Sequence, residues 1–385
     1  MFESLELSHF KCFESFEKPI FFRQINLLTG SNGRGKSSIF QSILLLAQSY
    51  ELGKDWKSIQ LKGRFVELGN YKDVIYNGQT DTQLSITLTT DNETYNTMKF
   101  VCQGSKDEGI GCDIDNIYVN GEALFDEIGM GNAISDENNV GKDTATPLQK
   151  VVLPTSTYDC FTQLASVYYI SAERLGPRNA VKMIQGRVSD QIGIHGERVL
   201  NSLYDGKENF QKEVANAMSV ILGGASVKVL NSEDYEYVKA LLDSKDNQEG
   251  YKPVNVGFGY SYILPLIVLP MLVPDKSKIF IENPEAHLHP GAQSRLMDYL
   301  ISIAKEKDLQ LFIETHSDHF VNALRIATKK RMHGINHHDS AIIHINRNEA
   351  GKASFAHIKM DKDGNLSDYP RDFMDEWTKQ MLYLV

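Results

Sequence analysis

The pattern of apolar and polar positions predicts an α/β core built from both ends of the chain. Residues 2–9 alternate as a half-buried strand does, and residues 10–22 are typical of a turn and a second strand. Continuous apolar runs at residues 25–28, 278–282 and 309–313 predict buried strands, because a strand covered on both faces carries apolar side chains at successive positions. We therefore expect an α/β fold with a mixed sheet at its core.

The middle of the chain carries a different pattern. Between about residues 61 and 168, short alternating segments are separated by turn signals such as Asn77-Gly78 and Asn120-Gly121, which predicts an antiparallel β lobe. Residues 127–148 are rich in Gly, Asn, Asp and Thr, a composition typical of a long loop. Helical spacing at residues 195–222 is followed by further short strands, so we expect an insertion beside the β lobe.

Composition and charge add little to this picture. The formal net charge of −10 argues against a surface that is basic throughout, although a local DNA-binding groove remains compatible with it. The most apolar run, residues 263–273, is shorter than the ~20 residues of a membrane span and contains two prolines. The N-terminus has no basic and apolar leader, so we expect a cytoplasmic protein that does not bind membranes.

Residues 24–38 contain the spacing of a phosphate-binding P-loop, between an apolar strand and an apolar helix. The glycines allow successive backbone N–H groups to face an anion, and the helix N-terminus that follows favours negative charge. Lys36 would reach the β- and γ-phosphates of ATP, and the Ser37 hydroxyl would ligate Mg²⁺. The residues predicted to bind the nucleotide are Gly30, Ser31, Asn32, Gly33, Gly35, Lys36, Ser37 and Ser38.

Two strands in the second half of the chain end in residues suited to the same site. Glu282 ends the strand at residues 278–282 and is predicted to be the second metal ligand beside Ser37, because Mg²⁺ requires hard oxygen ligands. His316 follows the strand at residues 309–313. Because ligands bind at the carboxyl ends of parallel strands, His316 is predicted to contact the γ-phosphate or the attacking water.

A third signal precedes both strands. Gly257, Gly259 and Ser261 open an apolar helix, and glycines at a helix N-terminus predict a second anion site. By itself this pattern has low specificity. Its position in the chain, after the P-loop and before Glu282 and His316, makes it more informative.

This order of motifs resembles that of the ABC-type ATPases, in particular the subgroup of SMC heads, RecF and the overcoming-lysogenization-defect ATPases. Residues 282–290, 314–319 and 369–376 are also similar to a prokaryotic family of stand-alone P-loop ATPases with a C-terminal domain of unknown function. The resemblance implies a head-to-head homodimer with ATP sandwiched between subunits. In it Gly257, Gly259 and Ser261 contact the γ-phosphate bound by the partner, and His316 acts as the switch histidine.

One residue departs from the pattern of the relatives. The position after the metal-site acid usually holds a glutamate that acts as the general base, and here it holds Asn283, which cannot accept a proton at neutral pH. Either Glu285 or His316 takes over this role, or turnover is slow. Residues 70–73 are the candidate equivalent of the Q-loop.

Several alternatives compete with these assignments. His287, His289, His316 and His319 could form a zinc site, with packing or dimer contacts as the simpler interpretation. Asp361 and Asp363 suit either a nuclease metal site or a solvated turn. Arg174 and Arg178 suit either a phosphate or partner contact or, more simply, structural ion pairs. The separated cysteines are expected to be reduced, with a Cys102–Cys112 bridge as the alternative.

Two functions follow from the sequence. In the first, the protein is an ATPase whose cycle controls DNA or a protein partner, in phage defence or DNA repair. In the second, it is an ATP-gated scaffold or clamp that holds a separate effector with little turnover. The predicted domains are residues 1–70 with the P-loop, residues 71–250 with the β lobe and insertion, residues 251–350 with the second half of the ATPase head, and residues 351–385 with a C-terminal hairpin and helix.

Overall fold

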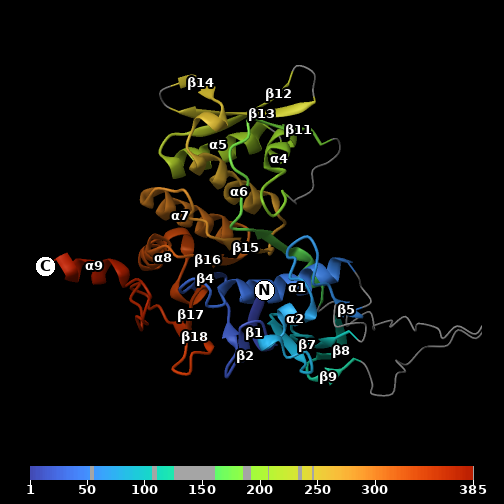
Figure 1. Ribbon diagram of the computed structural model, residues 1–385. Coiled ribbons are helices and arrows are strands. Elements are labelled where there is room, and N and C mark those ends of the chain that lie inside the picture. Colours follow the sequence, from blue (N-terminus) through green and yellow to red (C-terminus); the bar gives the residue numbers. More distant parts are fainter. Residues whose placement is uncertain are drawn as a thin grey trace, which may run out of the picture. The chain divides into compact units, whose positions relative to one another are not determined.

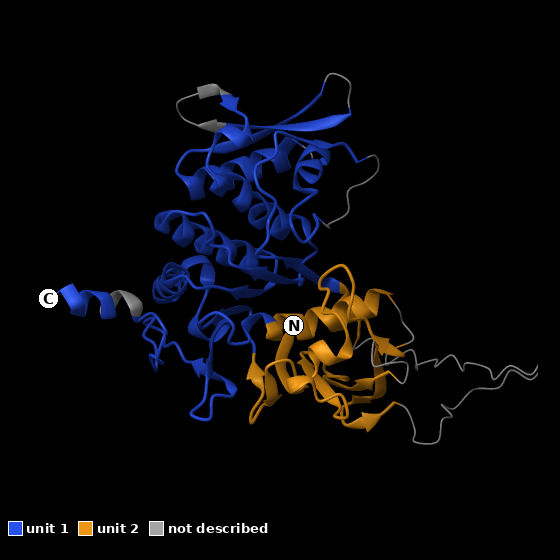
Figure 2. Cartoon of the chain, viewed as in Figure 1, with its two compact units in different colours: residues 1, 22–37, 166–385 blue, residues 2–21, 38–165 orange. Residues whose placement is uncertain are grey.

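The computed structural model describes residues 1–52, 56–105, 111–124, 161–184, 192–206, 208–232, 236–244 and 247–384. The predicted loop at residues 127–148 lies outside these residues. The chain divides into two compact units (Figure 2): unit 1 is Met1, Phe22–Ser37 and Ser166–Val385, and unit 2 is Phe2–Phe21 and Ser38–Ala165. These bounds differ from the predicted domains, because each unit gathers strands from separate parts of the chain. No helix among the described residues is long and apolar enough to cross a membrane.

The core of unit 1 is a six-stranded sheet in the order β10-β15-β16-β4-β17-β18 (Figure 1). The strands from β10 to β17 are parallel, and β18 is antiparallel to β17. All residues of β4 and β16 are buried, as expected for central strands covered on both faces. The strands are β4 (Ile25–Thr29), β10 (Val167–Ile170), β15 (Lys278–Glu282), β16 (Gln310–Glu314), β17 (Ser340–Arg347) and β18 (Ala353–Ile358).

Helices connect and cover these strands. The middle of α6 is apolar on every side and buried from Ile263 to Pro270, whereas α7 and α8 each turn one apolar face inward. α7 supplies the crossover that the parallel strands β15 and β16 require. The helices of unit 1 are α4 (Val199–Asp205), α5 (Glu208–Leu222), α6 (Phe258–Leu272), α7 (Pro290–Glu306), α8 (Asp318–Lys330) and α9 (Glu376–Leu384). Short 3₁₀ helices cover Pro253–Asn255, Met332–Gly334 and His337–Asp339.

A second, antiparallel sheet in unit 1 corresponds to the predicted insertion. Its order is β11-β13-β12, with β14 also paired to β13. Val227 and Val229 of β12 and Val214 and Met218 of α5 belong to the same buried cluster, so the sheet and this helix share a core. The strands are β11 (Ala180–Lys182), β12 (Ser226–Asn231), β13 (Tyr237–Ser244) and β14 (Asn247–Tyr251).

Unit 2 contains the predicted antiparallel β lobe together with residues 2–21 and 38–60, which were predicted to be part of the ATPase head. Its sheet has the order β2-β1-β6-β7-β8-β5, with β3 paired to β1 and β9 paired to β8. The ring of Trp56 lies 5.0 Å from the rings of both Phe100 and Phe161, and Cys102 and Cys112 are free thiols. The strands are β1 (Phe2–Phe10), β2 (Phe13–Ser15), β3 (Ile20–Phe21), β5 (Ser58–Ile59), β6 (Leu84–Thr90), β7 (Thr97–Gly104), β8 (Cys112–Val119) and β9 (Glu122–Ala123). The helices are α1 (Lys36–Leu52), whose first two residues belong to unit 1, α2 (Tyr71–Val74), and the 3₁₀ turns Tyr76–Gly78 and Thr162–Ser166, the last of which ends in unit 1.

Candidate nucleotide-binding site

The predicted P-loop joins the end of β4 to the start of α1 at Lys36. Gly30, Gly33 and Gly35 have φ angles of 132°, 70° and 111°, which residues with a Cβ rarely adopt. At Gly30 a Cβ would also lie 2.2 Å from the carbonyl oxygen of Ile345 on β17. The loop conformation therefore requires glycine at the positions that the motif specifies.

The Lys36 side chain folds back over this loop. Its Nζ donates to the carbonyl oxygens of Gly30, at 2.8 Å, and Ser31, at 3.1 Å. Burial lowers the pKa of Lys36, while the carboxylates of Glu314 and Glu285 act in the opposite direction. A buried ammonium group at this position is suited to exchange carbonyl partners for phosphate oxygens.

The Ser37 hydroxyl contacts Glu314, the last residue of β16. Ser37 Oγ donates to Glu314 Oε2 at 2.9 Å and lies 3.3 Å from Oε1, and Lys36 Nζ is 3.8 Å from Oε1. The contact follows from strand order, because β16 pairs directly with β4 and places Leu28 opposite Glu314. The sequence identified Glu314 only as the end of a strand and assigned it no role.

Glu282 lies one strand further away, at the end of β15 opposite Glu314. Its carboxylate accepts a hydrogen bond from the backbone N–H of Ala172, at 3.2 Å, and another from the Tyr169 side chain. These partners belong to β10 and the residues after it, on the side of β15 away from β4. The predicted metal ligand is therefore at the expected sheet edge, with its hydrogen bonds directed away from Ser37.

The two neighbouring carboxylates carry an unfavourable electrostatic interaction. The pKa of Glu314 is raised to about 7, first by burial and then by the charge of Glu282, although Lys36 and Ser37 act against this shift. Burial also raises the pKa of Glu282. Like charges held together out of water favour binding of a cation, which removes the repulsion between them.

The conformation at Asn283 explains why this residue type is tolerated there. Asn283 has a φ of 43°, a left-handed conformation in which asparagine is enriched, and its N–H donates to the Glu314 carbonyl at 2.9 Å. Its Oδ1 atom is buried and has no hydrogen-bond partner among the described residues. The side chain therefore presents an amide at the position after Glu282.

Glu285 is held against the segment that carries His316. Its Oε2 accepts from the Thr315 hydroxyl and its Oε1 accepts from the His316 N–H, each at 2.8 Å. Burial and the charge of Lys36 lower the pKa of His316, whereas Glu285 acts in the opposite direction. His316, Glu285 and the P-loop lysine thus lie close enough to influence one another electrostatically.

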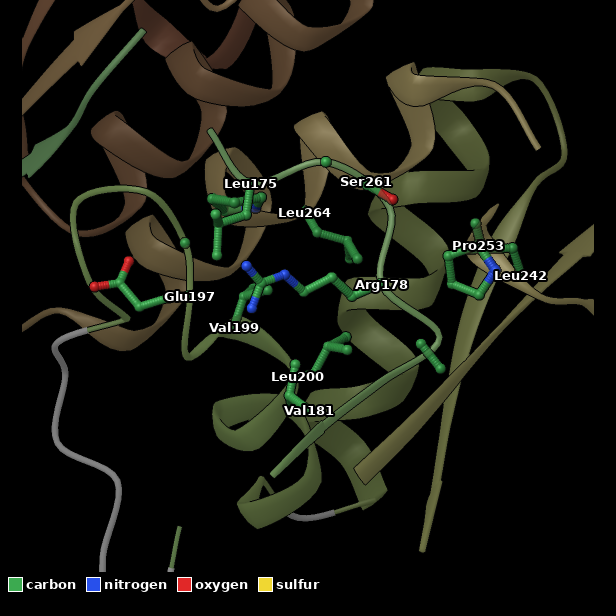
Figure 3. A pocket seen from close by; sticks show the side chains of 14 residues that line it. Leu175, Arg178, Val181, Glu197, Val199, Leu200, Leu242, Pro253, Ser261 and Leu264 are labelled. Atoms are coloured by element: carbon green, nitrogen blue, oxygen red, sulfur yellow. The ribbon is translucent and has the colours of Figure 1, made fainter. Parts of the chain in front are cut away.

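Arg174 has a role that the sequence did not indicate. The buried guanidinium donates to the carbonyl oxygens of Glu282, at 2.8 Å, and Asn283, at 2.6 Å, and lies over the Tyr262 ring at 5.4 Å. It therefore supports the backbone beside the metal-site acid, rather than forming one of the predicted ion pairs. Arg178 instead extends across a pocket that Ser261 and Leu264 also line (Figure 3).

The predicted second anion site begins α6. Gly257 is the N-cap residue, and at Gly259 a Cβ would lie 2.6 Å from the carbonyl oxygen of His287. The Phe258 ring lies next to the same histidine, with centroids 5.5 Å apart and the ring planes tilted by 32°. Gly257 and Gly259 line an open groove beside it. The first turn of α6 is thus packed against the segment that follows Glu282.

The alternative metal sites receive no support from the described residues, where no three His, Cys, Asp or Glu side chains are grouped to hold a metal ion. His289 caps α7 by accepting from the Gly291 N–H at 3.2 Å. Asp361 accepts from the N–H groups of Asp363 and Asn365, as expected for a turn. A metal ion at the P-loop would therefore depend on phosphate oxygens as additional ligands.

The remaining predicted residues are distributed over both units. Asn32 and Gly33 are exposed in the P-loop of unit 1, whereas Ser38 and the candidate Q-loop residues 70–73 belong to unit 2. In unit 2, Asn70 caps α2. The donor set around Lys36 and Ser37 consists of a hydroxyl, carboxylates and backbone amides, which suits Mg²⁺ with a polyphosphate.

Comparison with known proteins identified two family models that match separate parts of the chain. Residues 178–321 match the family model described as an AAA ATPase domain, and residues 335–384 match the model described as Protein of unknown function (DUF3696). No curated protein matches the chain significantly. The chain is similar in structure to an Smc head bound to the C-winged helix domain of ScpA, with 14% identity, a TM-score of 0.54, and coverage of 94% of this chain and 98% of that one.

A second similar structure is the Smc head domain with an extended coiled coil bound to the C-terminal domain of ScpA, derived from Pyrococcus furiosus. It shares 12% identity with a TM-score of 0.51, and the match covers 100% of this chain and 99% of that one. The chain therefore has the fold of an SMC head. Its matches to an AAA ATPase domain and to a C-terminal DUF3696 region confirm the resemblance seen in its motifs.

Proposed function

We propose that the protein binds ATP with Mg²⁺ at the P-loop and hydrolyses it slowly. The observation that supports this most directly is the grouping of Lys36, Ser37, Glu285 and His316 at one edge of the parallel sheet. Ser37 and, directly or through water, Glu282 would hold the Mg²⁺ ion. The bound ion would neutralise negative charge on the phosphates.

Residues of this chain would bind the phosphates and accept the proton of the attacking water. Lys36 and the P-loop amides would bind the β- and γ-phosphates. Ser38, in the first turn of α1, is also predicted to bind the nucleotide. Glu285 or His316 would accept the proton of the attacking water, because Asn283 cannot. Slow turnover is expected, since neither residue occupies the usual position of the base.

Phosphate release under single-turnover conditions tests the enzymatic proposal. We expect Lys36→Ala to remove hydrolysis, and Glu285→Gln and His316→Ala each to lower the rate by about 10²-fold. Lys330→Ala changes an exposed lysine of α8 and should leave the rate unchanged. A wild-type rate equal to that of Lys36→Ala would exclude the ATPase.

The alternative function is an ATP-gated clamp with little turnover, and the amide at Asn283 favours it. The two proposals differ in the hydrolysis rate and share the homodimer, in which Gly257, Gly259 and Ser261 would contact the nucleotide of the other subunit. Light scattering should show a doubled mass with ATP and Mg²⁺ for wild type but not for Ser261→Ala. A mass that does not change with nucleotide would contradict the sandwich.

A partner is proposed by analogy. The similar Smc heads are bound to domains of ScpA, so a separate effector protein is the partner we favour over DNA. Phage defence or DNA repair is the process that the resemblance suggests. Copurification from the native host, followed by mass spectrometry with and without ATP, would test whether a partner binds in a nucleotide-dependent way.

A further inference from the structure

We infer that Glu314, at the end of β16, is the carboxylate that holds the metal ion together with Ser37, and that Glu282 acts one strand further away. This inference rests on the proposed Mg²⁺-ATP site and specifies which acid completes it. No family match or motif assigned Glu314 a role.

Sheet order is the first argument. β16 lies between β4 and β15, so the end of β16 is the neighbour of the P-loop strand. Neighbouring strands are about 4.8 Å apart, and residues paired in parallel strands point to the same face. Leu28, Glu314 and Glu282 are paired in this way, so Glu282 begins about 4.8 Å further from the P-loop than Glu314 does.

The distance between Glu314 and Ser37 is the second argument. Mg²⁺ binds oxygens at 2.0–2.1 Å in an octahedron, which places adjacent ligands about 2.9 Å apart. Ser37 Oγ and Glu314 Oε2 are 2.9 Å apart. A cation that contacts the serine oxygen is therefore within reach of Glu314 without movement of either backbone.

The partners of the two carboxylates are the third argument. The Glu314 carboxylate contacts the side chains of Ser37 and Lys36, which both belong to the P-loop. Its side chain is 9% exposed. Glu282 is instead bonded to Ala172 and Tyr169. These hydrogen bonds hold the Glu282 carboxylate beside Glu314. From there it can orient water bound to the ion or partly neutralise the charge of the ion.

The test measures metal binding rather than turnover. Mn²⁺ would be titrated into protein with the nonhydrolysable analogue AMP-PNP, and free Mn²⁺ would be followed by electron paramagnetic resonance. We expect Glu314→Gln to weaken metal binding at least ten-fold and Glu282→Gln to weaken it less. Glu349→Gln, on the exposed β17–β18 hairpin, is the matched control and should bind as wild type does.

A second readout separates loss of the metal from loss of the fold. AMP-PNP affinity in EDTA should be equal or higher in Glu314→Gln, because one negative charge near the phosphates is gone. Glu314→Asp keeps the charge on a shorter side chain and should have intermediate metal affinity. A double-mutant cycle should show that Ser37→Ala and Glu314→Gln are not additive, as expected for two ligands of one ion.

The outcomes distinguish this inference from the function on which it rests. If Glu282→Gln abolishes metal binding and Glu314→Gln leaves it intact, the inference is wrong while the nucleotide site remains. If wild type binds AMP-PNP without any metal dependence, both the proposed Mg²⁺-ATP site and the role of Glu314 are excluded.

Discussion

Arg174 donates to three backbone carbonyls around the end of β15, one of which also accepts from the Ala286 N–H. Its guanidinium donates to Ser171, Glu282 and Asn283, and its side chain is 3% exposed. Burial lowers its pKa to about 10, which still leaves it charged at neutral pH. Arg174 therefore acts as a positioning residue for the end of β15.

We expect Arg174→Met to lower the free energy of unfolding by about 2–4 kcal/mol, because it removes a buried guanidinium that donates to three backbone carbonyl oxygens. Urea denaturation would measure the loss. Arg178→Met, which changes an exposed arginine four residues away, should alter stability by no more than about 0.5 kcal/mol. Equal effects of the two substitutions would show that the carbonyl contacts are unimportant.

His344, on β17, joins the P-loop strand to the C-terminal segment. Its Nε2 lies 3.3 Å from the Arg371 carbonyl, which can only accept, so Nε2 carries the hydrogen. In the neutral ring, which burial favours, Nδ1 accepts from the Thr29 hydroxyl 3.1 Å away.

Burial lowers the pKa of His344, with Lys36 acting in the same direction and Asp372 and Asp375 against it. The unfolded chain therefore takes up the proton more readily, and stability should fall as the pH drops below about 6.5. Unfolding at pH 8, 7, 6 and 5 should show a steeper loss for wild type than for His344→Gln. Parallel pH profiles would contradict this prediction.

At the residue scale, the sequence predicted the P-loop because its chemistry is local. Lys36 and Ser37 lie within seven residues of Gly30 and need only one turn and one helix start. The contact between Ser37 and Glu314 joins positions 277 residues apart and depends on which strand lies beside β4. No spacing in the sequence encodes that choice, so Glu314 was missed.

At the scale of elements, apolar runs predicted most strands of the central sheet but not their order. The runs at residues 25–28, 278–282 and 309–313 became β4, β15 and β16, as expected. β16 lies between the other two, an order that the apolar pattern of each strand does not show. Because of this order, the acid at a strand end nearest the P-loop is Glu314, whereas the sequence alone had indicated Glu282 for that place.

The first turn of α6 offers a test at this scale, because its two glycines have different surroundings. A Cβ at Gly259 would meet the His287 carbonyl oxygen at 2.6 Å, whereas nothing lies within 4 Å of a Cβ at Gly257, where φ is −61°. We expect Gly259→Ala to destabilise the protein by about 1–3 kcal/mol through this clash, and Gly257→Ala to have little effect. Thermal unfolding of the two variants would measure the difference, and equal melting temperatures would refute the close packing.

At the scale of the whole molecule, the family matches do not coincide with the folding units. The AAA ATPase match covers residues 178–321 and omits the P-loop, while the DUF3696 match covers residues 335–384. Yet β17, inside the DUF3696 match, pairs through Ser340–His344 with the whole of β4, the P-loop strand. The C-terminal region is therefore part of the ATPase sheet in unit 1, which linear domain bounds could not indicate.

This arrangement predicts opposite results for two truncations. A chain ending at residue 334 loses β17 and β18, and with them the buried side chains of Ile342, Ile343, Ile345 and Ile358. Burying each such side chain contributes about 1.5–3 kcal/mol, so the loss of about 6–12 kcal/mol is comparable to the whole stability of a typical protein. The edge of β4 would also be left unpaired.

We therefore expect the chain ending at residue 334 to lack a cooperative thermal transition and to be degraded rapidly in limited proteolysis. A chain ending at residue 375 loses only α9, in which Leu382, Tyr383 and Leu384 are 74%, 91% and 79% exposed. Its melting temperature should stay within about 2 °C of the full chain, since surface changes alter stability by about 0.5 kcal/mol or less. If the chain ending at residue 334 melted cooperatively at the wild-type temperature, β17 would be dispensable and the ATPase sheet would end at β4.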